Sequence, residues 1–403
     1  MNRKSENDIY MKKVAVIFEG SIYNRKGLVN AVLERAKRLN VCTDFEVDVF
    51  CIMAYENLLI RKLRHTKKRE KKLCEVVDGL KVNILWHDFS FIDYISSIRL
   101  HKEQFFLKRW VKQISKKFQN YDLILAHSYT AGLIGLEAKQ EYKIPYCVTW
   151  HGSDIHTAPV KNEKIRKNTK NIIDNAHINF FVSKALLETA KNITDYRESW
   201  IVSYNGASDS FYQFSNGKKN ELRKRYNITD NTKIVPFVGY LIDIKNVLIL
   251  PNVFKKVQEK YKRKIEFWLI GDGKLRNILD QQFKECDINY KMWGNQSVDL
   301  IPSLMNCIDI LILPSKNEGL PLVVVEALRC GVNVVGSNVG GIAEVIGLEN
   351  VFDLDECFVP NISNRIIEFL NGNITQVVSG DFSWDKTIAK ELRICKSILS
   401  ENN

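Results

Sequence analysis

Two glutamates, Glu318 and Glu326, lie in a segment where the sequence predicts a strand followed by a helix. The apolar run Ile308–Leu313 predicts the strand, and Pro321, a residue type favoured at a first helical position, marks the start of the helix. The first turn of a helix has free backbone N–H groups and a partial positive charge, which can bind phosphates or hydroxyl groups. The segment therefore combines two carboxylates with the amides of Leu320, Leu322 and Val323.

The elements that would position these groups alternate between strands and helices in both halves of the chain, which predicts parallel sheets covered by helices. Ligands of such open sheets bind outside the carboxyl ends of the strands, where Glu318 would lie. Asp78-Gly79 is a hairpin signal that interrupts the alternation. The predicted strands are Val14–Phe18, Phe45–Cys51, Asp122–His127, Pro145–Trp150 and Ile178–Val182, then Lys233–Gly239, Ile265–Ile270, Ile288–Met292, Ile308–Leu313 and Asn333–Gly336.

The chain has 403 residues, more than a single core usually holds, which predicts two domains of about 200 residues each. The polar segment Asn205–Asn231, which contains glycines, is expected to join them. We expect an N-terminal domain over residues 1–200, a C-terminal domain over 201–375, and a final helix over 376–403 that packs back towards the N-terminal domain.

The residues around Glu318 form a longer pattern, P-S-K-N-E-G-L-P-L-V-V-V-E-A, followed by G-V-N-V-V-G-S and V-G-G-I-A-E. This pattern resembles the donor-site signature of the retaining glycosyltransferases of family 4. The resemblance runs from about Lys13 to Trp384 and includes I-P-Y-C-V-T-W-H-G-S-D, from Ile144 to Asp154. It implies an α/β protein of the GT-B fold, in which two Rossmann-like domains face each other with a cleft between them.

The resemblance also implies roles for individual residues. Glu326 would accept hydrogen bonds from ribose hydroxyls, whereas the catalytic candidates Glu318 and His151 would contact the donor sugar. Lys245 would bind the diphosphate, but Tyr240 stands where the family has an arginine, which removes a bidentate phosphate partner. The other donor-binding candidates are Gly27, Gly271, Gly319, Leu320, Leu322 and Val323.

Each of these assignments has a plainer alternative. His127, which matches a less specific position of the family, and His151 can both be ordinary packing residues, because neutral histidine is common in protein interiors. Glu326 can be a solvated helical residue, and the Gly271 turn can be a tight turn without a ligand. The sequence alone leaves these alternatives open.

As the resemblance implies, the reaction would transfer a sugar from a UDP- or GDP-linked donor to a glycan or lipid-linked acceptor, in surface polysaccharide or glycoconjugate biosynthesis. Anomeric configuration would be retained by front-face attack, with the leaving phosphate taking the acceptor's proton. No carboxylate nucleophile is then needed, unlike in a retaining glycosidase. Neither a metal ion nor another cofactor is expected. The alternatives are a nucleotide-sugar epimerase of the same fold and a non-catalytic partner subunit that binds nucleotide or glycan.

The net charge of +12 lies entirely in the first half, since residues 1–200 carry +12 and residues 201–403 carry none. Residues 61–120 alone carry +10, including the run Arg61–Lys72. A following stripe of apolar residues among basic ones predicts either an anionic membrane partner or core packing with solvated lysines. Nucleic acid is not expected, because no recognised module accompanies the charge. The stripe is Phe106, Trp110, Ile114 and Phe118, beside Lys108, Arg109, Lys112, Lys116 and Lys117.

The sequence contains no apolar run near the roughly 20 residues needed to span a bilayer, and its start lacks the apolar core of a signal peptide. We therefore expect a cytoplasmic protein that can associate peripherally with the membrane. Nine cysteines occur without C-x-x-C or zinc-like spacing, which predicts reduced thiols and no structural metal.

Overall fold

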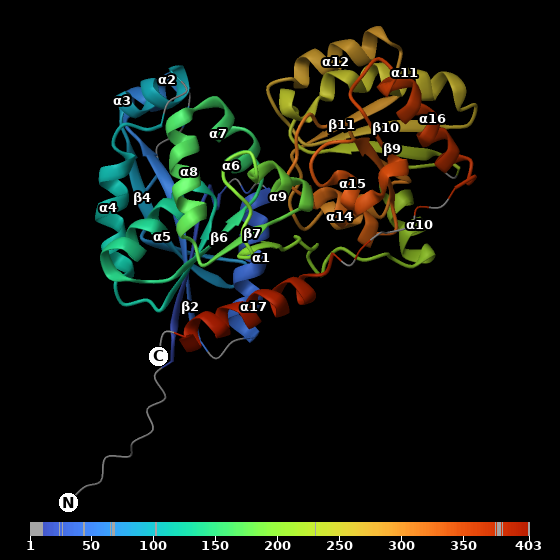
Figure 1. Cartoon of the computed structure of the whole chain (residues 1–403). Helices are drawn as coiled ribbons and strands as arrows, with labels where there is room; N and C mark the ends of the chain where they lie inside the picture. Colours follow the sequence, from blue (N-terminus) through green and yellow to red (C-terminus); the bar gives the residue numbers. More distant parts are fainter. Residues whose placement is uncertain are drawn as a thin grey trace, which may run out of the picture. The chain divides into compact units, whose positions relative to one another are not determined.

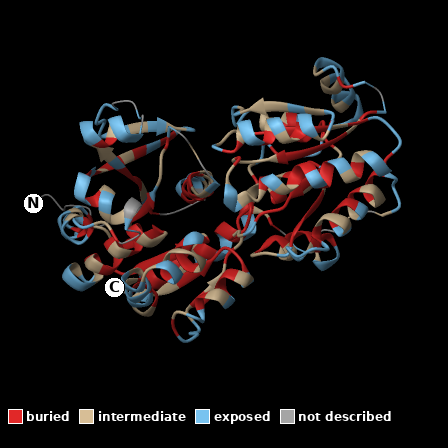
Figure 2. Cartoon of the chain, turned by 90° about the horizontal axis from the view of Figure 1, so that it is seen from above, coloured by how far each residue is buried: buried red, intermediate tan, exposed pale blue. Residues whose placement is uncertain are grey.

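The computed structural model describes residues 11–23, 25, 27–42, 45–64, 66, 69–100, 103–229, 231–374, 376, 380 and 382–401. The chain divides into two compact units (Figure 1). The first unit holds the residues up to Ser203 together with the segment from Asp385 onwards, and the second unit is Tyr204–Trp384. Buried residues follow the strands and the sheet-facing sides of the helices, whereas exposed residues lie on the outer helix faces (Figure 2).

The first unit is built on an eight-stranded sheet of order β3-β4-β2-β1-β5-β6-β7-β8. Neighbouring strands are parallel except for β3 and β4, which form a hairpin through Asp78 and Gly79. Residues Val14–Phe18 of the central strand are buried, as expected for a parallel sheet covered by helices. The strands are β1 (Lys13–Glu19), β2 (Glu46–Glu56), β3 (Cys74–Val77), β4 (Leu80–Phe89), β5 (Leu123–His127), β6 (Tyr146–Trp150), β7 (Ile178–Phe181) and β8 (Trp200–Val202).

Helices of very different length connect these strands. Only α1, α5, α8 and α17 exceed three turns; several others are single turns. The helices are α1 (Gly27–Cys42), α2 (Leu58–Arg64), α3 (Phe91–Tyr94), the π-helix η1 (Ile95–Arg99), α4 (Leu107–Ser115), η2 (Lys116–Phe118), α5 (Tyr129–Tyr142), α6 (Ser153–His156), α7 (Ala158–Lys161), α8 (Glu163–Asn175), α9 (Lys184–Ala190) and α17 (Trp384–Glu401).

Helix α17 is attached to the first unit by a buried ion pair. The Arg35 Nε of α1 lies 3.2 Å from the Glu391 Oε1 of α17, and both side chains are almost fully enclosed. The Ser203 hydroxyl donates to the same Glu391 oxygen over 2.5 Å, and the Ser203 carbonyl accepts from Arg35 over 3.2 Å. Each buried polar group thereby has a partner, which such groups require.

The second unit contains two three-stranded parallel sheets, of order β11-β10-β9 and β12-β13-β14. Strands β9 and β12 contact each other, and the Asp309 N–H just before β12 donates to the Ile234 carbonyl of β9 over 2.9 Å. The six strands therefore follow the 3-2-1-4-5-6 order of a Rossmann domain. They are β9 (Lys233–Val238), β10 (Ile265–Ile270), β11 (Tyr290–Gly294), β12 (Ile310–Leu313), β13 (Asn333–Ser337) and β14 (Val351–Phe352).

The helices of the second unit are α10 (Asn216–Arg225), η3 (Asp243–Lys245), η4 (Val247–Ile249), α11 (Leu250–Lys260), α12 (Arg276–Glu285), α13 (Ile301–Met305), α14 (Leu322–Arg329), α15 (Ile342–Ile346), η5 (Leu348–Asn350) and α16 (Phe358–Leu370). None of the helices within the described residues combines the length and apolar character needed to cross a membrane.

Every predicted strand overlaps an observed one, and the Asp78-Gly79 hairpin is confirmed. The predicted helix start near Pro321 is confirmed: Pro321 is the extended N-cap residue, and α14 begins at Leu322. The sequence did not predict the short strands β8 and β14 or the short helices α2 and α3.

The basic aromatic stripe around α4 packs mainly against its own unit. Phe118 is fully buried. The Trp110 ring lies tilted against His87, with ring centroids 4.9 Å apart, and its Nε1 donates to the Trp86 carbonyl over 3.0 Å. Its basic residues remain exposed. Of the two alternatives left open for this stripe, core packing therefore applies to Trp110 and Phe118, whereas Phe106 is exposed. Three residues of the neighbouring basic run, His65, Lys67 and Lys68, lie outside the described residues.

Candidate active site

The strand order of the second unit brings its site residues to one place. From β9 the chain continues to β10 and β11 on one side of the sheet, and from β12 it continues to β13 and β14 on the other side. The carboxyl ends of β9 and β12 therefore form a topological switch point. Such a point is the usual ligand site of open α/β sheets. Lys245 lies in η3, soon after β9, and Glu318 follows β12. Residues 73 positions apart in sequence thus meet at one sheet edge.

Lys245 and Glu318 form an ion pair at this edge. The Lys245 Nζ lies 2.5 Å from the Glu318 Oε1, which also accepts from the Ser315 hydroxyl over 2.7 Å. Gly340 allows this arrangement: its φ is +52°, and a side-chain Cβ there would stand 1.9 Å from the Glu318 carbonyl oxygen. The pair combines a cation suited to phosphate with a carboxylate suited to hydroxyl groups.

The amino end of α14 presents unbonded amides beside Glu318. Val324 donates to the Pro321 carbonyl, whereas the N–H groups of Gly319, Leu320, Leu322 and Val323 have no hydrogen-bond acceptor within the described part of the chain. No side chain caps this helix. These amides, together with the helix dipole, form a site that favours a negatively charged group.

Glu326 lies one turn further along α14, and its side chain is only partly accessible. Among the described residues, its carboxylate has neither a hydrogen bond nor an ion pair. Burial raises the pKa of Glu326 from 4.5 to about 7. A partly buried carboxylate without donors is unfavourable for the fold but available to accept hydrogen bonds from a ligand.

The turns after β9 and β10 pack against each other through glycines. Gly271 has φ +130°, and a Cβ there would lie 2.0 Å from the Gly239 carbonyl oxygen. Close contact between the two backbone turns therefore explains why position 271 requires glycine, and this explanation needs no ligand. Tyr240, next along the first turn, is half-buried.

In the first unit, the two candidate histidines contact each other. The His127 Nδ1, at the end of β5, lies 3.1 Å from the His151 Nε2, just after β6. Burial and the positive charge of Arg35 lower the pKa of His151 to about 3, and burial lowers the pKa of His127 well below its usual value. Both rings are therefore neutral near pH 7, with one donating to the other. Asp154 fixes the following turn by accepting from the Gly152 N–H over 2.7 Å.

Gly27 begins α1, and a side chain there would meet nothing within 4 Å. The predicted residues thus fall into two groups. Lys245, Glu318, Glu326 and the α14 amides gather in the second unit, with Gly271 and Tyr240 in the adjoining turns, whereas His151 and Gly27 belong to the first unit. Sequence reasoning missed Ser315, whose only signal is a polar side chain directly after a buried strand.

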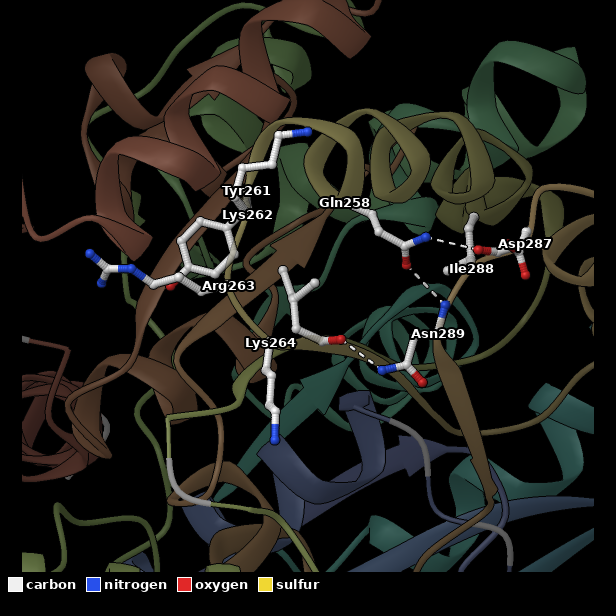
Figure 3. Close-up of a pocket in the computed structure, with 9 residues that line it drawn as sticks. Gln258, Tyr261, Lys262, Arg263, Lys264, Asp287, Ile288 and Asn289 are labelled. Atoms are coloured by element: carbon white, nitrogen blue, oxygen red, sulfur yellow. Dashed lines mark hydrogen bonds between the residues drawn. The ribbon is translucent and has the colours of Figure 1, made fainter.

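A second opening in the same unit lies at the opposite edge of the sheet (Figure 3). It has a volume of about 640 Å³, and its lining residues, including Gln258, Lys264 and Asn289, precede β10 and β11 rather than follow them. Asn289 and Gln258 are already hydrogen-bonded to each other and to the backbone. This pocket is remote from the Lys245–Glu318 pair and takes no part in the candidate site.

The fold and these contacts define a two-unit α/β protein whose second unit has a lysine–glutamate ion pair and the amino end of a helix at one sheet edge. Residues 26–211 match Glycosyltransferase Family 4, and residues 218–378 match Glycosyl transferases group 1. The chain belongs to the glycosyltransferases of family 4, a class of sugar-transferring enzymes.

Individual relatives agree with this assignment. The chain is 29% identical over 227 residues to the putative teichuronic acid biosynthesis glycosyltransferase TuaC of Bacillus subtilis, covering 56% of this chain and 55% of TuaC. It is 26% identical over 244 residues to the UDP-Gal:alpha-D-GlcNAc-diphosphoundecaprenol alpha-1,3-galactosyltransferase of Escherichia coli, covering 56% and 60% of the two chains. The chain thus spans little more than half the length of these curated relatives.

The fold is that of a solved glycosyltransferase structure. HepE of Anabaena, in complex with UDP and glucose, has a TM-score of 0.66 and 20% identity, covering 89% of this chain and 90% of that one. At this identity the likeness concerns the fold alone, and it confirms the predicted GT-B class.

Proposed function

We propose that this chain is a retaining glycosyltransferase that moves a sugar from a nucleotide-diphosphate sugar, held by the second unit, to an acceptor held by the first unit. One observation carries the proposal: the ion-paired Lys245 and Glu318 lie at the switch point with the unbonded amides of α14. Departure of a diphosphate builds negative charge, which a lysine and fixed amides stabilise. Glu318 and Glu326 offer acceptors for sugar and ribose hydroxyls.

The donor base is proposed to be uracil. HepE was crystallised with UDP and glucose, and the name of the Escherichia coli relative specifies a UDP-linked galactose donor. A GDP-linked donor is the alternative. The carboxylate of Glu326, without a protein donor, suits the ribose that both nucleotides share.

Retention is proposed to proceed by front-face attack. Glu318 is engaged by Lys245 and Ser315, which makes it a positioning and hydrogen-bonding group rather than a free nucleophile. His151 is neutral, so in this scheme it would contact a sugar hydroxyl instead of supplying charge. The leaving phosphate would then accept the acceptor's proton.

A donor panel tests the proposal. The protein is incubated with UDP- and GDP-sugars, with and without lipid extract, and nucleotide release is measured; NMR of the product then reports its anomeric configuration. We expect Lys245→Ala to weaken UDP binding by about 10- to 100-fold, the usual worth of a charge-assisted contact. Lys274→Ala is the matched control, because Lys274 is exposed and paired with Asp243 in a neighbouring turn.

Three outcomes would contradict the proposal in different ways. An inverted product would exclude retention, and equal losses in the two lysine variants would remove Lys245 from the donor site. Nucleotide binding without any release would favour the non-catalytic partner subunit, which Tyr240 in place of the family's arginine makes the main alternative. Interconversion of free nucleotide sugars would instead indicate an epimerase.

The acceptor is proposed to be a glycan or a lipid-linked saccharide of a surface polysaccharide or other glycoconjugate, with the protein on the cytoplasmic membrane face. The names of the two relatives specify teichuronic acid biosynthesis and a diphosphoundecaprenol acceptor. A surface of the first unit supports membrane contact: α2 and α3 lie against each other (Figure 1) and carry exposed apolar side chains. We call this the α2–α3 face; it comprises Leu58, Leu59, Leu63, Phe91 and Ile92.

The charge of this face indicates an anionic lipid surface. The last turn of α2 is basic and includes the exposed Lys62, and each basic residue near such a surface contributes about 1 kcal/mol. Wild-type protein should co-sediment with anionic but not neutral vesicles, and less so as salt rises, because screening acts over about 8 to 10 Å. We expect replacement of Leu59 and Leu63 by Ser to abolish this binding even at low salt.

The basic residues of the α4 segment provide the comparison. Their replacement by Gln removes charge but no exposed apolar side chain, so we expect it to weaken vesicle binding and to leave UDP affinity unchanged. If wild-type protein ignores anionic vesicles at low salt, membrane association is excluded and a soluble acceptor is favoured. The residues are Lys108, Arg109, Lys112, Lys116 and Lys117.

A further inference from the structure

The first unit contains a pocket of its own at the carboxyl ends of β1 and β2. Its volume is about 650 Å³, within the range of about 300 to 1,000 Å³ typical of ligand sites. The strand order runs from β1 through β2 towards one edge of this sheet and from β5 through β6 towards the other, so the topological switch point of the first unit lies between β1 and β5. The pocket adjoins this point. Its charged lining residues are Glu19, Glu56, Arg61, Arg64 and Arg69.

The carboxylates of this pocket are already engaged. Glu56 forms an ion pair with Arg64 and accepts from the Thr66 hydroxyl over 2.6 Å. Glu19, at the end of β1, is hydrogen-bonded to the Thr130 side chain. Neither carboxylate is therefore paired with Arg61, which lies in the middle of α2.

Arg61 lacks an acceptor. Its Nε is enclosed by protein and has no hydrogen-bond partner, and no other acceptor or carboxylate contacts its guanidinium within the described ranges of the chain. Among the described residues, Arg69, which lines the same pocket, contacts neutral groups: the Ser21 hydroxyl at 3.4 Å and the Tyr23 ring, 5.6 Å from its centroid. A buried guanidinium Nε without an acceptor is unfavourable, and the planar guanidinium fork of a partly buried arginine matches carboxylate and phosphate groups.

From this geometry we propose that the Arg61 pocket binds an oxyanion group, a phosphate or a carboxylate, of the acceptor. The inference rests on the proposed transferase function and adds the chemical class of its acceptor. Within the described residues, neither Arg61 nor Arg69 is paired with a carboxylate, so both side chains can supply positive charge to such a group. The pocket has room for the anionic group and part of a sugar.

The surroundings favour an anion attached to a lipid. Helix α2 carries Arg61 in the pocket wall and, on the same seven residues, the exposed Leu58, Leu59 and Leu63 of the α2–α3 face. With a lipid-linked acceptor at a membrane surface, Arg61 would therefore bind the phosphate while the exposed leucines of the same helix contact the lipid. A soluble phosphorylated or carboxylated acceptor presents the same anion without the lipid.

Calorimetry with inorganic pyrophosphate and with malate tests the pocket directly. Saturating UDP is present throughout, so that the donor site in the second unit is occupied and does not bind the probe. We expect Arg61→Gln to raise the dissociation constant of the probe by about 10- to 100-fold. Arg61→Lys should lose part of the affinity, since it keeps the charge but not the bidentate fork.

Lys62→Gln is the matched control, because it removes one exposed charge from the same helix outside the pocket. We expect it to change probe affinity less than twofold, and all three variants to bind UDP as wild type does, which also reports that they fold. Absence of probe binding to the wild type, or equal losses in Arg61→Gln and Lys62→Gln, would overturn the proposal.

Transfer assays distinguish a lipid-linked anion from a soluble one. They also distinguish failure of the pocket proposal from failure of the transferase proposal. Arg61→Gln should raise KM for a lipid-diphosphate acceptor in vesicles or for a soluble anionic acceptor, whichever is the substrate, with little change in donor hydrolysis. An unchanged KM for both acceptors would refute the pocket while leaving the transferase function intact. If no donor is consumed with any acceptor, the transferase proposal fails, but the calorimetric result stands on its own.

Discussion

Replacing Glu326 by Gln should stabilise the second unit and at the same time weaken nucleotide binding. The carboxylate is partly buried, has no donor within the described chain, and titrates at about 7 instead of 4.5. A carboxylate buried without donors lowers the stability of the fold but remains able to accept hydrogen bonds from a ligand. Functional sites commonly show this conflict between stability and activity. Gln keeps the shape of the side chain and removes its charge.

The size and pH dependence follow from the two pKa values. In the unfolded chain the carboxyl group loses its proton above pH 4.5, whereas the folded protein retains it up to about pH 7. The fold therefore loses stability as pH rises from 4.5 to 7, by about 1.4 kcal/mol for each pH unit, and the loss is constant above that range. Relative to wild type, Glu326→Gln should be more stable by about 3 kcal/mol at pH 8 and by less than about 1 kcal/mol at pH 5.

Urea unfolding of the second unit, followed at pH 5 and pH 8, measures this difference, and calorimetry with UDP measures the functional loss. UDP affinity of the wild type should also rise by about tenfold between pH 6 and pH 8, as Glu326 ionises and can accept from both ribose hydroxyls. Glu318→Gln is the control: it leaves Lys245 without its carboxylate, so no stabilisation is expected.

Two results would refute this reasoning. A stability difference between Glu326→Gln and wild type that is the same at pH 5 and pH 8 would mean that the carboxylate is solvated rather than buried. Unchanged UDP affinity in the variant would mean that Glu326 does not contact the nucleotide, whatever its effect on stability.

Three further outcomes are expected. Glu318→Ala should chiefly lower turnover and leave free-nucleotide binding intact or tighter, because Lys245 loses a competing partner; calorimetry showing a loss equal to that of Glu326→Ala would contradict the separate roles. Tyr240→Arg should tighten UDP binding by placing a guanidinium near the phosphates, and an unchanged dissociation constant would mean that Tyr240 points elsewhere. The first unit should lose stability below about pH 6.5, by up to about 2 kcal/mol at pH 5 from His151 alone, because burial lowers the pKa of His151, and that of His127 in the same direction; urea unfolding of a variant with Gln at both positions should show a flatter pH profile.

The sheet strands were predictable from sequence because they are apolar runs bounded by turn residues, and Ile265–Ile270 was predicted with its observed limits. The short elements were not. Helix α2 has seven residues and α3 four, too few for a helical period to emerge, and β14 has only two. The missed α2 matters most, since it carries Arg61 and the exposed leucines.

The site was predictable in its residue types but not in its contacts. Resemblance identified Lys245 and Glu318, yet their direct pairing depends on the adjacency of β9 and β12, which local sequence does not encode. The pKa of Glu326 depends on the neighbours that bury it, again a tertiary property. The unpartnered state of Arg61 is likewise visible only once the engagement of Glu56 and Glu19 is known.

The distribution of charge connects the donor and acceptor proposals. If the excess of basic residues served the nucleotide diphosphate, it would lie in the second unit, but residues 201–403 carry no net charge. There, the proposed phosphate partners are the backbone amides of α14 and Lys245, whose charge is balanced by Glu318. The whole +12 belongs to residues 1–200, where Arg61 and Arg69 line a pocket whose carboxylates, Glu19 and Glu56, are engaged by other residues. A positive charge on the first unit and none on the second is the distribution expected when the acceptor of the proposed transfer, or the surface that carries it, is anionic.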